Sequence, residues 1–462
     1  MDLISALKLI LPEERLLTGA DLAGNYYHIW RMNEPLIAKA LVLPKTTEEV
    51  SAIMKVCYER QQTVIVFGGR TNLVGSTKPR GDEVLISLEK INAISEVDIA
   101  SRTVTVGAGV ILDNILEAVK KKELLFPLNF GARGSAQIGG IIATNAGGLR
   151  VIRYGMTRNL ILGLEVVLAD GTIISSLKKI IKDNSAYDLK QLFIGSEGTL
   201  GIITKAVLRL YEANRSRNSC LVALNEYTKV VKFLKHMDKG LAGTMTGFEL
   251  MWPSFYAAAT TPPAEPKPPL PHGHNYYVLV ESLGNDQTND QTVMLELLET
   301  ALHEKLITDG VLAQSESDLQ WFWKIREDVH SCVSRSTHDQ HFDISLPIAS
   351  IGGELAKIRE NLLELEGVNE VYEFGHVADG NIHLIIDKAS EALSLKNAIN
   401  DIVYHPLTAL GGSISAEHGI GLDKKAYLPL CRTAAEIALM KQIKIQLDPY
   451  NLLNPGKVLD LP

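Results

Sequence analysis

Short apolar runs and one amphipathic segment alternate over the first part of the chain. Runs with the length and composition of buried strands lie at 40–43, 63–67, 164–169 and 201–210. Residues 46–60 predict a helix, because a hydroxyl cap at Thr46 is followed by two glutamates in the first turn. Asp170-Gly171 predicts a hairpin. We assign residues 1–212 to a first domain.

The pattern changes near residue 213. The strands and helices expected beyond it lie at 221–224, 276–281, 287–304 and 355–366. The Pro-rich segment 260–274 has a stiff, extended character and is expected to be a surface connector. Alternating strands and helices predict a second α+β domain, residues 213–424, that caps the first. Residues 425–462 are expected to form an ordered C-terminal segment.

The stretch E-F-G-H-V-A-D-G-N-I-H-L-I-I predicts a β-hairpin in the second domain. Its segment 378–381 has strong turn chemistry, because Asp, Gly and Asn tolerate a positive φ. With strands at 374–377 and 382–386, His376 and His383 lie near the turn on neighbouring strands. Their imidazoles could then point to one place.

A carboxylate and a third histidine, Glu417 and His418, follow in S-A-E-H-G-I-G. Three or four nitrogen and oxygen donors within reach of one another suit a divalent transition metal. Spacing alone leaves an alternative open, in which His376 and His383 only make hydrogen bonds.

The bulk composition narrows the class of protein. A chain of 462 residues is long enough for two domains, and a net charge of −8 argues against a general nucleic-acid binder. The apolar run near the N-terminus predicts a short helix and not a signal peptide, and no apolar run has membrane-spanning length. The aromatic run at 26–30 is expected to serve packing. The four distant cysteines are expected to be buried thiols, as in a reducing cytoplasm; they are Cys57, Cys220, Cys332 and Cys431.

Three glycine-rich segments occur in the first domain. They are G-G-R-T-N-L-V-G at 68–75, I-G-G-I-I-A-T-N-A-G-G at 138–148 and G-S-E-G-T-L-G-I-I-T at 195–204. Glycines allow a ligand to approach the backbone closely, and successive N–H groups can hold phosphate. The first segment alone could be an ordinary turn, and none has the dinucleotide-fold or P-loop spacing. Three such loops, fed by strands, predict one extended ligand over a sheet edge.

These segments resemble the FAD loops of the vanillyl-alcohol-oxidase/PCMH-type flavoproteins. One branch of this family, the FAD-linked D-2-hydroxyacid dehydrogenases, is similar to the chain in four further segments: 248–252, 374–383, 416–421 and 454–457. This branch includes D-2-hydroxyglutarate dehydrogenase, D-lactate dehydrogenase and the glycolate oxidase FAD subunit. The resemblance implies an α+β fold: a PCMH-type two-subdomain FAD-binding domain and an α+β cap built on an antiparallel sheet. FAD is expected to be non-covalent, because no His or Cys occupies a tethering position in the three loops.

The resemblance also implies site residues. The expected FAD-binding residues are Gly68, Gly69, Arg70, Thr71, Asn72, Leu73, Gly139, Gly140, Thr144, Asn145, Gly148, Glu197, Gly198, Gly201, Ile202 and Asn454. The implied metal ligands are His376, His383 and Glu417, with zinc as the family's precedent; the donor types also suit iron or manganese. His418 is the implied general base and Asn381 a polar residue of the substrate or metal shell.

Arg326, in W-K-I-R-E, is the implied clamp for the substrate carboxylate, since its planar fork suits that group. The alternative is a surface arginine paired with Glu327 or Asp328. Two expected substrate-binding positions depart from the hydroxyglutarate pattern: His341 stands in place of a lysine and His330 in place of a threonine. A neutral imidazole binds a carboxylate less well than a lysine does, which leaves the substrate open between D-2-hydroxyglutarate, D-lactate and similar acids.

The expected activity is oxidation of a D-2-hydroxy acid, with electrons passed to a quinone, a cytochrome or another flavoprotein. An oxidase that uses oxygen, or a flavoprotein subunit of a larger, glycolate-oxidase-like complex, are the alternatives. We expect a cytoplasmic protein, compatible with the membrane periphery and with a homodimer.

Overall fold

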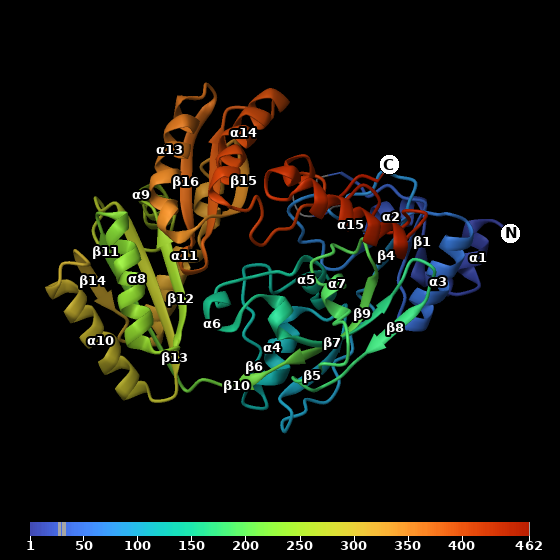
Figure 1. The fold of residues 1–462 in the computed structure, drawn as a ribbon, viewed down its shortest axis with the longest axis horizontal. Coiled ribbons are helices and arrows are strands. Elements are labelled where there is room, and N and C mark those ends of the chain that lie inside the picture. Colours follow the sequence, from blue (N-terminus) through green and yellow to red (C-terminus); the bar gives the residue numbers. More distant parts are fainter. Residues whose placement is uncertain (26–28, 30–33, 462) are drawn as a thin grey trace. The chain divides into compact units, whose positions relative to one another are not determined.

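The computed structural model describes residues 1–25, 29 and 34–461, which divide into two compact units (Figure 1). The first unit contains Met1–Gly148, Tyr154–Ala213 and Glu417–Pro462. The second contains Leu149–Arg153 and Asn214–Ala416. The main changes between the units fall at 213/214 and 416/417, whereas the sequence predicted domain boundaries at 212/213 and 424/425. The aromatic run at 26–30 lies outside the described residues except for Ile29, which is buried.

A four-stranded, mainly parallel sheet begins the first unit. Its order is β1 (Leu16–Leu17), β2 (Ala40–Val42), β4 (Val84–Ser87) and β3 (Val64–Phe67). Strands β2 and β3 both pair with β4 in parallel, which the crossover through helix α3 (Thr47–Glu59) makes possible. The Thr46 hydroxyl caps α3 by accepting a 3.2 Å hydrogen bond from the Glu49 N–H. The strands and the helix predicted here are confirmed.

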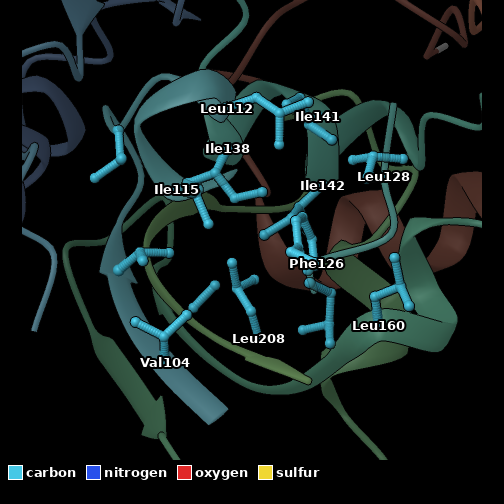
Figure 2. Close-up of a cluster of buried hydrophobic side chains, with 14 of the residues drawn as sticks. Val104, Leu112, Ile115, Phe126, Leu128, Ile138, Ile141, Ile142, Leu160 and Leu208 are labelled. Carbon is cyan, nitrogen blue, oxygen red and sulfur yellow. The ribbon is translucent and has the colours of Figure 1, made fainter. Parts of the chain in front are cut away.

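An antiparallel sheet forms the second half of this unit. Its order is β5 (Thr103–Gly107), β9 (Ile202–Arg209), β7 (Ile161–Val167) and β8 (Ile173–Ser176). Its apolar side chains form a core with helices α4 (Leu112–Lys120) and α5 (Ile138–Thr144), visible around Phe126 and Leu208 in Figure 2. The hairpin predicted at Asp170-Gly171 joins β7 to β8.

The prediction that the second glycine segment is a loop is wrong, because residues Ile138–Thr144 form helix α5. A Cβ at Gly139 would come within 2.7 Å of the Ala108 Cβ, so only glycine lets this helix pack so closely. That packing outweighs the low helix propensity of glycine. The third segment also follows a helix, α7 (Lys190–Phe193), and not a strand.

The second unit is built on a seven-stranded antiparallel sheet. The strands, in order, are β14 (Asp309–Leu312), β11 (Ser216–Leu224), β13 (Tyr276–Gly284), β12 (Met245–Met251), β16 (Val368–His376), β17 (Asn381–Lys388) and β15 (His338–Ser345). Its helices are α8 (Tyr227–Leu241), α9 (Pro253–Thr260), α10 (Gln287–His303), α11 (Glu316–Glu327), α12 (Val329–Val333), α13 (Ile351–Glu364) and α14 (Leu393–Leu410). A core that joins α9 and α11 to the sheet includes Phe255, Phe322 and Phe374. The α+β cap on an antiparallel sheet is therefore confirmed.

The remaining elements are short or terminal. They are α1 (Leu3–Lys8), α2 (Gly19–Asn25), α6 (Val151–Tyr154), α15 (Ala434–Leu447), β6 (Leu124–Leu125), β10 (Tyr211–Glu212) and the 3₁₀ turns Glu13–Arg15, Thr157–Leu160, Ile348–Ser350, Val377–Asp379 and Lys425–Leu430. No helix in the described part of the chain is both long and apolar enough to cross a membrane.

Two further expectations need correction. Cys57, Cys220 and Cys332 are buried free thiols, but Cys431 is partly exposed, because it follows the short 3₁₀ turn after the glycine-rich 417–421 segment and not a core element. The Pro-rich connector lies mostly at the surface, yet its Leu270 is buried in the core of the second unit.

Candidate active site

The predicted hairpin carries its two histidines side by side. Strands β16 and β17 are joined by a 3₁₀ turn and by Gly380, whose φ of +85° explains the glycine at that position. His376 pairs with Asn381 and Phe374 pairs with His383, so both histidines project from one face. Their ring centroids are 5.4 Å apart, with the rings nearly perpendicular at 87°. The prediction that the imidazoles approach one another is confirmed.

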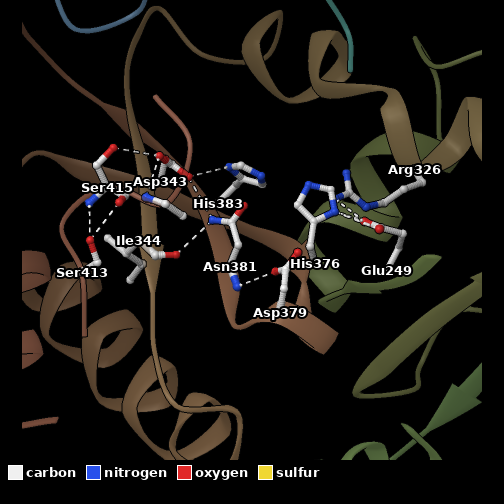
Figure 3. Close-up of polar contacts among 11 residues, drawn as sticks. Glu249, Arg326, Asp343, Ile344, His376, Asp379, Asn381, His383, Ser413 and Ser415 are labelled. Carbon is white, nitrogen blue, oxygen red and sulfur yellow. Dashed lines mark hydrogen bonds and ion pairs between the residues drawn. The ribbon is translucent and has the colours of Figure 1, made fainter. Parts of the chain in front are cut away.

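A buried glutamate on the neighbouring strand supports His376 (Figure 3). Glu249 lies opposite His376 in the β12–β16 pair, and both of its carboxylate oxygens are 2.8 Å from His376 Nδ1. Burial alone would raise the pKa of Glu249, but the charges of His376 and Arg326 outweigh it and hold the pKa below its ordinary value. Sequence reasoning gave Glu249 no role. A charged residue inside the apolar strand F-E-L-M was the available signal.

Arg326 is a buried residue and not a surface one. It lies on α11 with only 3% of its surface exposed, and its NH2 is 2.7 Å from Glu249 Oε2. Its guanidinium carbon is 4.8 Å from the centroid of the Phe374 ring. The alternative of a surface pair with Glu327 or Asp328 is therefore wrong. Its Nε has no hydrogen-bond partner among the described residues, and such a buried donor suits an anion.

Asp343 joins the hairpin to the segment before Glu417. It is fully buried on β15, opposite His383, and its Oδ1 accepts a 2.9 Å hydrogen bond from Asn381 Nδ2. Its Oδ2 accepts a 3.1 Å hydrogen bond from the Ala416 N–H. It also accepts a 3.3 Å hydrogen bond from the Ser415 hydroxyl, as Figure 3 shows. Asn381 Oδ1 has no hydrogen-bond partner in the described part of the chain.

The pKa of one more acid near the turn, Asp379, is shifted from its ordinary value. Asp379 lies between the histidine strands and accepts a 3.1 Å hydrogen bond from the Asn381 N–H. Although the side chain of Asp379 is exposed, the protein atoms around it remove part of its hydration and raise its pKa from 3.8 to about 6, while the charge of His376 opposes the shift. Perturbed acids of this kind are common at functional sites.

The two positions that depart from the hydroxyglutarate pattern lie in different surroundings. His341 is partly buried on β15 and forms an ion-pair contact with Asp339. His330 is exposed on α12. Within the described part of the chain, a partner that would offset positive charge is found for His341 and not for His330.

Glu417 and His418 begin the last segment of the first unit. Backbone N–H groups of Ile420 and Gly421 donate hydrogen bonds of 2.6 and 3.0 Å to the Glu197 carboxylate. The Glu417 side chain lies against Gly147, where a Cβ would overlap its carboxylate. The roles expected for Glu417 and His418 stay predictions.

The first glycine segment is a tight loop closed by a side chain. A Cβ at Gly69 would overlap the Ser135 carbonyl, and Arg70 has a left-handed φ of 58°. Asn72 Oδ1 accepts hydrogen bonds from the N–H groups of Val74 (3.1 Å) and Ser76 (2.8 Å). This loop is therefore held in one shape.

All three glycine segments and the C-terminal segment converge on Glu197. Ser76, directly after the first segment, donates a short hydrogen bond to its carboxylate, and the Glu197 N–H donates a 2.8 Å bond to Ala143 O of the second. Asn454 Nδ2 donates a 2.7 Å bond to Glu197 O, while Asn454 Oδ1 accepts one of 2.9 Å from the Val66 N–H. The implied return of Asn454 to the first unit is confirmed. Burial raises the pKa of Glu197.

The chain was compared with known families. A model described as FAD binding domain matches residues 38–176. A model described as FAD linked oxidases, C-terminal domain, matches residues 213–458, more than half of the chain. The chain belongs to the FAD-linked oxidases.

Relatives of this flavoprotein narrow the branch. It is 36% identical over 462 residues to the mitochondrial D-2-hydroxyglutarate dehydrogenase of Danio rerio, covering 99% of the chain and 85% of the relative. It is 35% identical to the D-2-hydroxyglutarate dehydrogenase of Xanthomonas citri pv. viticola, covering 99% and 97%. The chain is thus an FAD-dependent oxidoreductase of the D-2-hydroxyacid dehydrogenase branch. The cytoplasmic location stays a prediction.

A solved structure supports the fold assignment. The substrate-bound p-cresol methylhydroxylase superposes with a TM-score of 0.78 at 16% identity, covering 99% of this chain and 96% of that one. At this identity the likeness concerns the fold alone. It confirms the PCMH-type arrangement expected from the glycine segments.

The first unit of this FAD-linked oxidase fits the cofactor on its own geometry. Gly140 has open space around it, and Gln137 Oε1, next to Gly68, is buried without a hydrogen-bond partner among the described residues. A large polar ligand requires backbone that it can approach closely and an acceptor atom that does not already accept a hydrogen bond.

Proposed function

We propose that this FAD-linked oxidase oxidises a D-2-hydroxy acid to the 2-oxo acid, with D-2-hydroxyglutarate as the first substrate to test. The observation that carries the proposal is the buried Arg326, whose Nε has no hydrogen-bond partner among the described residues and which lies near a pair of histidines. An arginine fork is the group that binds a carboxylate in two contacts. The named activity of both curated relatives supports the same acid.

The substrate could also be a shorter acid with one carboxylate, such as D-lactate. His341 forms its ion-pair contact with Asp339, so any positive charge on the imidazole is offset at the position that would attract a second carboxylate. D-2-hydroxyglutarate has a second carboxylate that D-lactate lacks. How well the enzyme binds that carboxylate would therefore decide which of the two acids it prefers.

In this proposal each residue has a separate task. Arg326 binds the C1 carboxylate, and His418 takes the proton of the substrate hydroxyl on an imidazole nitrogen, whose ordinary pKa lies near the working pH. His376, His383 and Glu417 would hold a divalent metal, for which we propose zinc, and Asn381 would supply a polar contact. Bound FAD supplies a hydride acceptor and bound zinc a Lewis acid.

The metal part of the proposal has support in the second unit alone. One ligand atom of His376 lies within 4.8 Å of one of His383, a separation that two ligands of one ion can have. Glu417 directly follows Ala416, whose N–H is bound to Asp343, the residue opposite His383. Contacts with FAD are proposed for the fifteen residues of the glycine segments named above and for Asn454.

The substrate is tested with a panel of D- and L-2-hydroxy acids and an artificial dye as acceptor. We expect turnover of D-acids only, with D-2-hydroxyglutarate and D-lactate compared by kcat/KM. Turnover of L-acids alone would contradict the proposal. Oxygen consumption in the same assay separates a dehydrogenase that uses a carrier from an oxidase, and native mass separates an isolated enzyme from a subunit or a homodimer.

A further inference from the structure

Glu249 is in contact with two groups of the proposed site. Its carboxylate is 1% exposed, contacts His376 on the neighbouring strand and contacts Arg326 on α11. A carboxylate is expensive to bury unless its oxygens are used. The way in which they are used therefore indicates what the residue does.

The two contacts of Glu249 differ in geometry. His376 Nδ1 is 2.8 Å from each carboxylate oxygen and forms a hydrogen bond. Arg326 NH2 is 2.7 Å from Oε2, whereas Arg326 Nε forms no hydrogen bond with any described residue. Glu249 thus fixes His376 through Nδ1 and pairs with one end of the Arg326 guanidinium.

The bond to His376 selects one state of the ring. An imidazole that donates its Nδ1–H keeps the lone pair on Nε2, where it can bind a metal. Carboxylates behind metal-binding histidines commonly fix the ring in this way. The contact is built into the sheet, because Glu249 and His376 are directly opposite in the β12–β16 pair.

We propose that Glu249 is a positioning residue that orients His376 for metal binding and neutralises Arg326 while it leaves the Nε donor of Arg326 unoccupied. This inference rests on the proposed function, since it takes His376 as a ligand and Arg326 as the carboxylate clamp. A single side chain then prepares both the metal-binding and the substrate-binding group.

Glu373 offers a matched control. It is also a buried glutamate of this sheet, and it is paired with an arginine of a helix: Arg359 of α13 lies 2.8 Å from its carboxylate. Because side chains alternate along a strand, residue 373 projects from the face of β16 opposite to His376. It shares the burial and the ion pair of Glu249 but not the contact with a histidine of the site.

The test compares Glu249→Gln, Glu373→Gln and wild type as FAD-loaded proteins. Zinc affinity is measured by competition with a chromophoric chelator, and the absorption spectrum of bound cobalt(II) reports the ligand geometry. We expect about 10- to 100-fold weaker zinc binding and an altered cobalt spectrum for Glu249→Gln. Glu373→Gln should match wild type in both.

Glu249→Gln leaves the Arg326 charge buried without its partner, so this variant could fail to fold. The double variant Glu249→Gln/Arg326→Met removes both charges and is expected to show the same weakened zinc binding. Arg326→Met alone should bind zinc within about twofold of wild type, because the His376 bond is intact. Circular dichroism and bound flavin verify folding.

Each outcome decides a different question. Wild-type zinc affinity in a folded Glu249 variant would overturn the inference while leaving the proposed function standing. A wild-type protein that binds neither zinc nor cobalt would overturn the proposed metal site and the inference with it.

Discussion

The Asp343 carboxylate accepts a 3.1 Å hydrogen bond from the Ala416 N–H, one residue before Glu417. The same carboxylate accepts the side-chain amide of Asn381 on the hairpin strand β17. One buried acid of β15 therefore ties the histidine hairpin to the segment that leads into the Glu417-His418 pair.

Replacing Asp343 with Asn should break this tie. Hydrogen bonds to a buried carboxylate contribute more to stability than hydrogen bonds between neutral groups do. We therefore expect the free energy of unfolding to fall by about 3 kcal/mol and kcat/KM to fall at least about tenfold. Ser415→Ala removes one donor only and should cost about 1 kcal/mol. Urea unfolding and steady-state kinetics measure both effects. An Asp343→Asn variant with unchanged kinetics would contradict the anchoring role.

Arg326→Lys keeps a positive charge but removes the planar fork. We expect kcat/KM to fall about 10- to 100-fold for every 2-hydroxy acid that the enzyme accepts, because a charged hydrogen-bond pair to the carboxylate is lost. The amount of bound flavin should be unchanged, because the variant alters none of the residues proposed to bind FAD. Equal kinetics for variant and wild type would remove Arg326 from the substrate site.

His341→Lys tests the choice between acids of different length. A lysine beside Asp339 keeps a fixed positive charge, so the ratio of kcat/KM for D-2-hydroxyglutarate over D-lactate should rise about tenfold or more. Asp339→Asn, which frees the histidine without adding a cation, should change the ratio less. An unaltered ratio in the lysine variant would show that position 341 does not select the substrate.

Glu373 should make stability depend on pH. Burial raises its pKa from 4.5 to about 7, although Arg359 opposes the shift. Between pH 4.5 and 7 the folded protein keeps a proton that the unfolded chain releases, so this contribution to stability is present below pH 4.5 and is lost as pH rises to 7. The total loss is about 3 kcal/mol.

Glu373→Gln should remove that contribution. The difference in unfolding free energy between wild type and variant should therefore shift by about 3 kcal/mol, against the wild type, from pH 4.5 to 7.5. Urea unfolding at several pH values measures this. If the unfolding free energies of wild type and variant change with pH in the same way, the Glu373 carboxyl is already ionised at pH 5.

FAD should leave the protein on denaturation. The three glycine segments contain no His or Cys at a tethering position. Acid precipitation should leave the yellow colour in the supernatant, and absorbance of both fractions at 450 nm (about the flavin maximum) measures it. Colour retained by the pellet after washing would indicate a covalent link.

Local chemistry was enough to predict the hairpin. The Ala-Asp-Gly-Asn turn and the apolar runs beside it fix the strands, and the strands fix where His376 and His383 point. The helix at 46–60 was predictable for the same reason, since its Thr46 cap lies next to it in the chain.

Contacts between residues that lie far apart in the chain could not be predicted from the sequence. Glu249 and His376 meet only because β12 pairs with β16, strands that lie more than a hundred residues apart. The residues near Arg326 in the chain do not show that α11 is covered, so they left the surface alternative for this arginine open. The glycine helix α5 was missed because its stability comes from contact with Ala108 and not from its own composition.

The convergence of four segments on Glu197 has a consequence for how the enzyme matures. Asn454, near the end of the chain, binds both Glu197 O and the N–H of Val66 on β3. A ribosome that has made the glycine segments has therefore not yet made the residue that links Glu197 to β3. Cofactor capture should follow synthesis of residue 454, and a chain cut short before it should be colourless even where its sheets have formed.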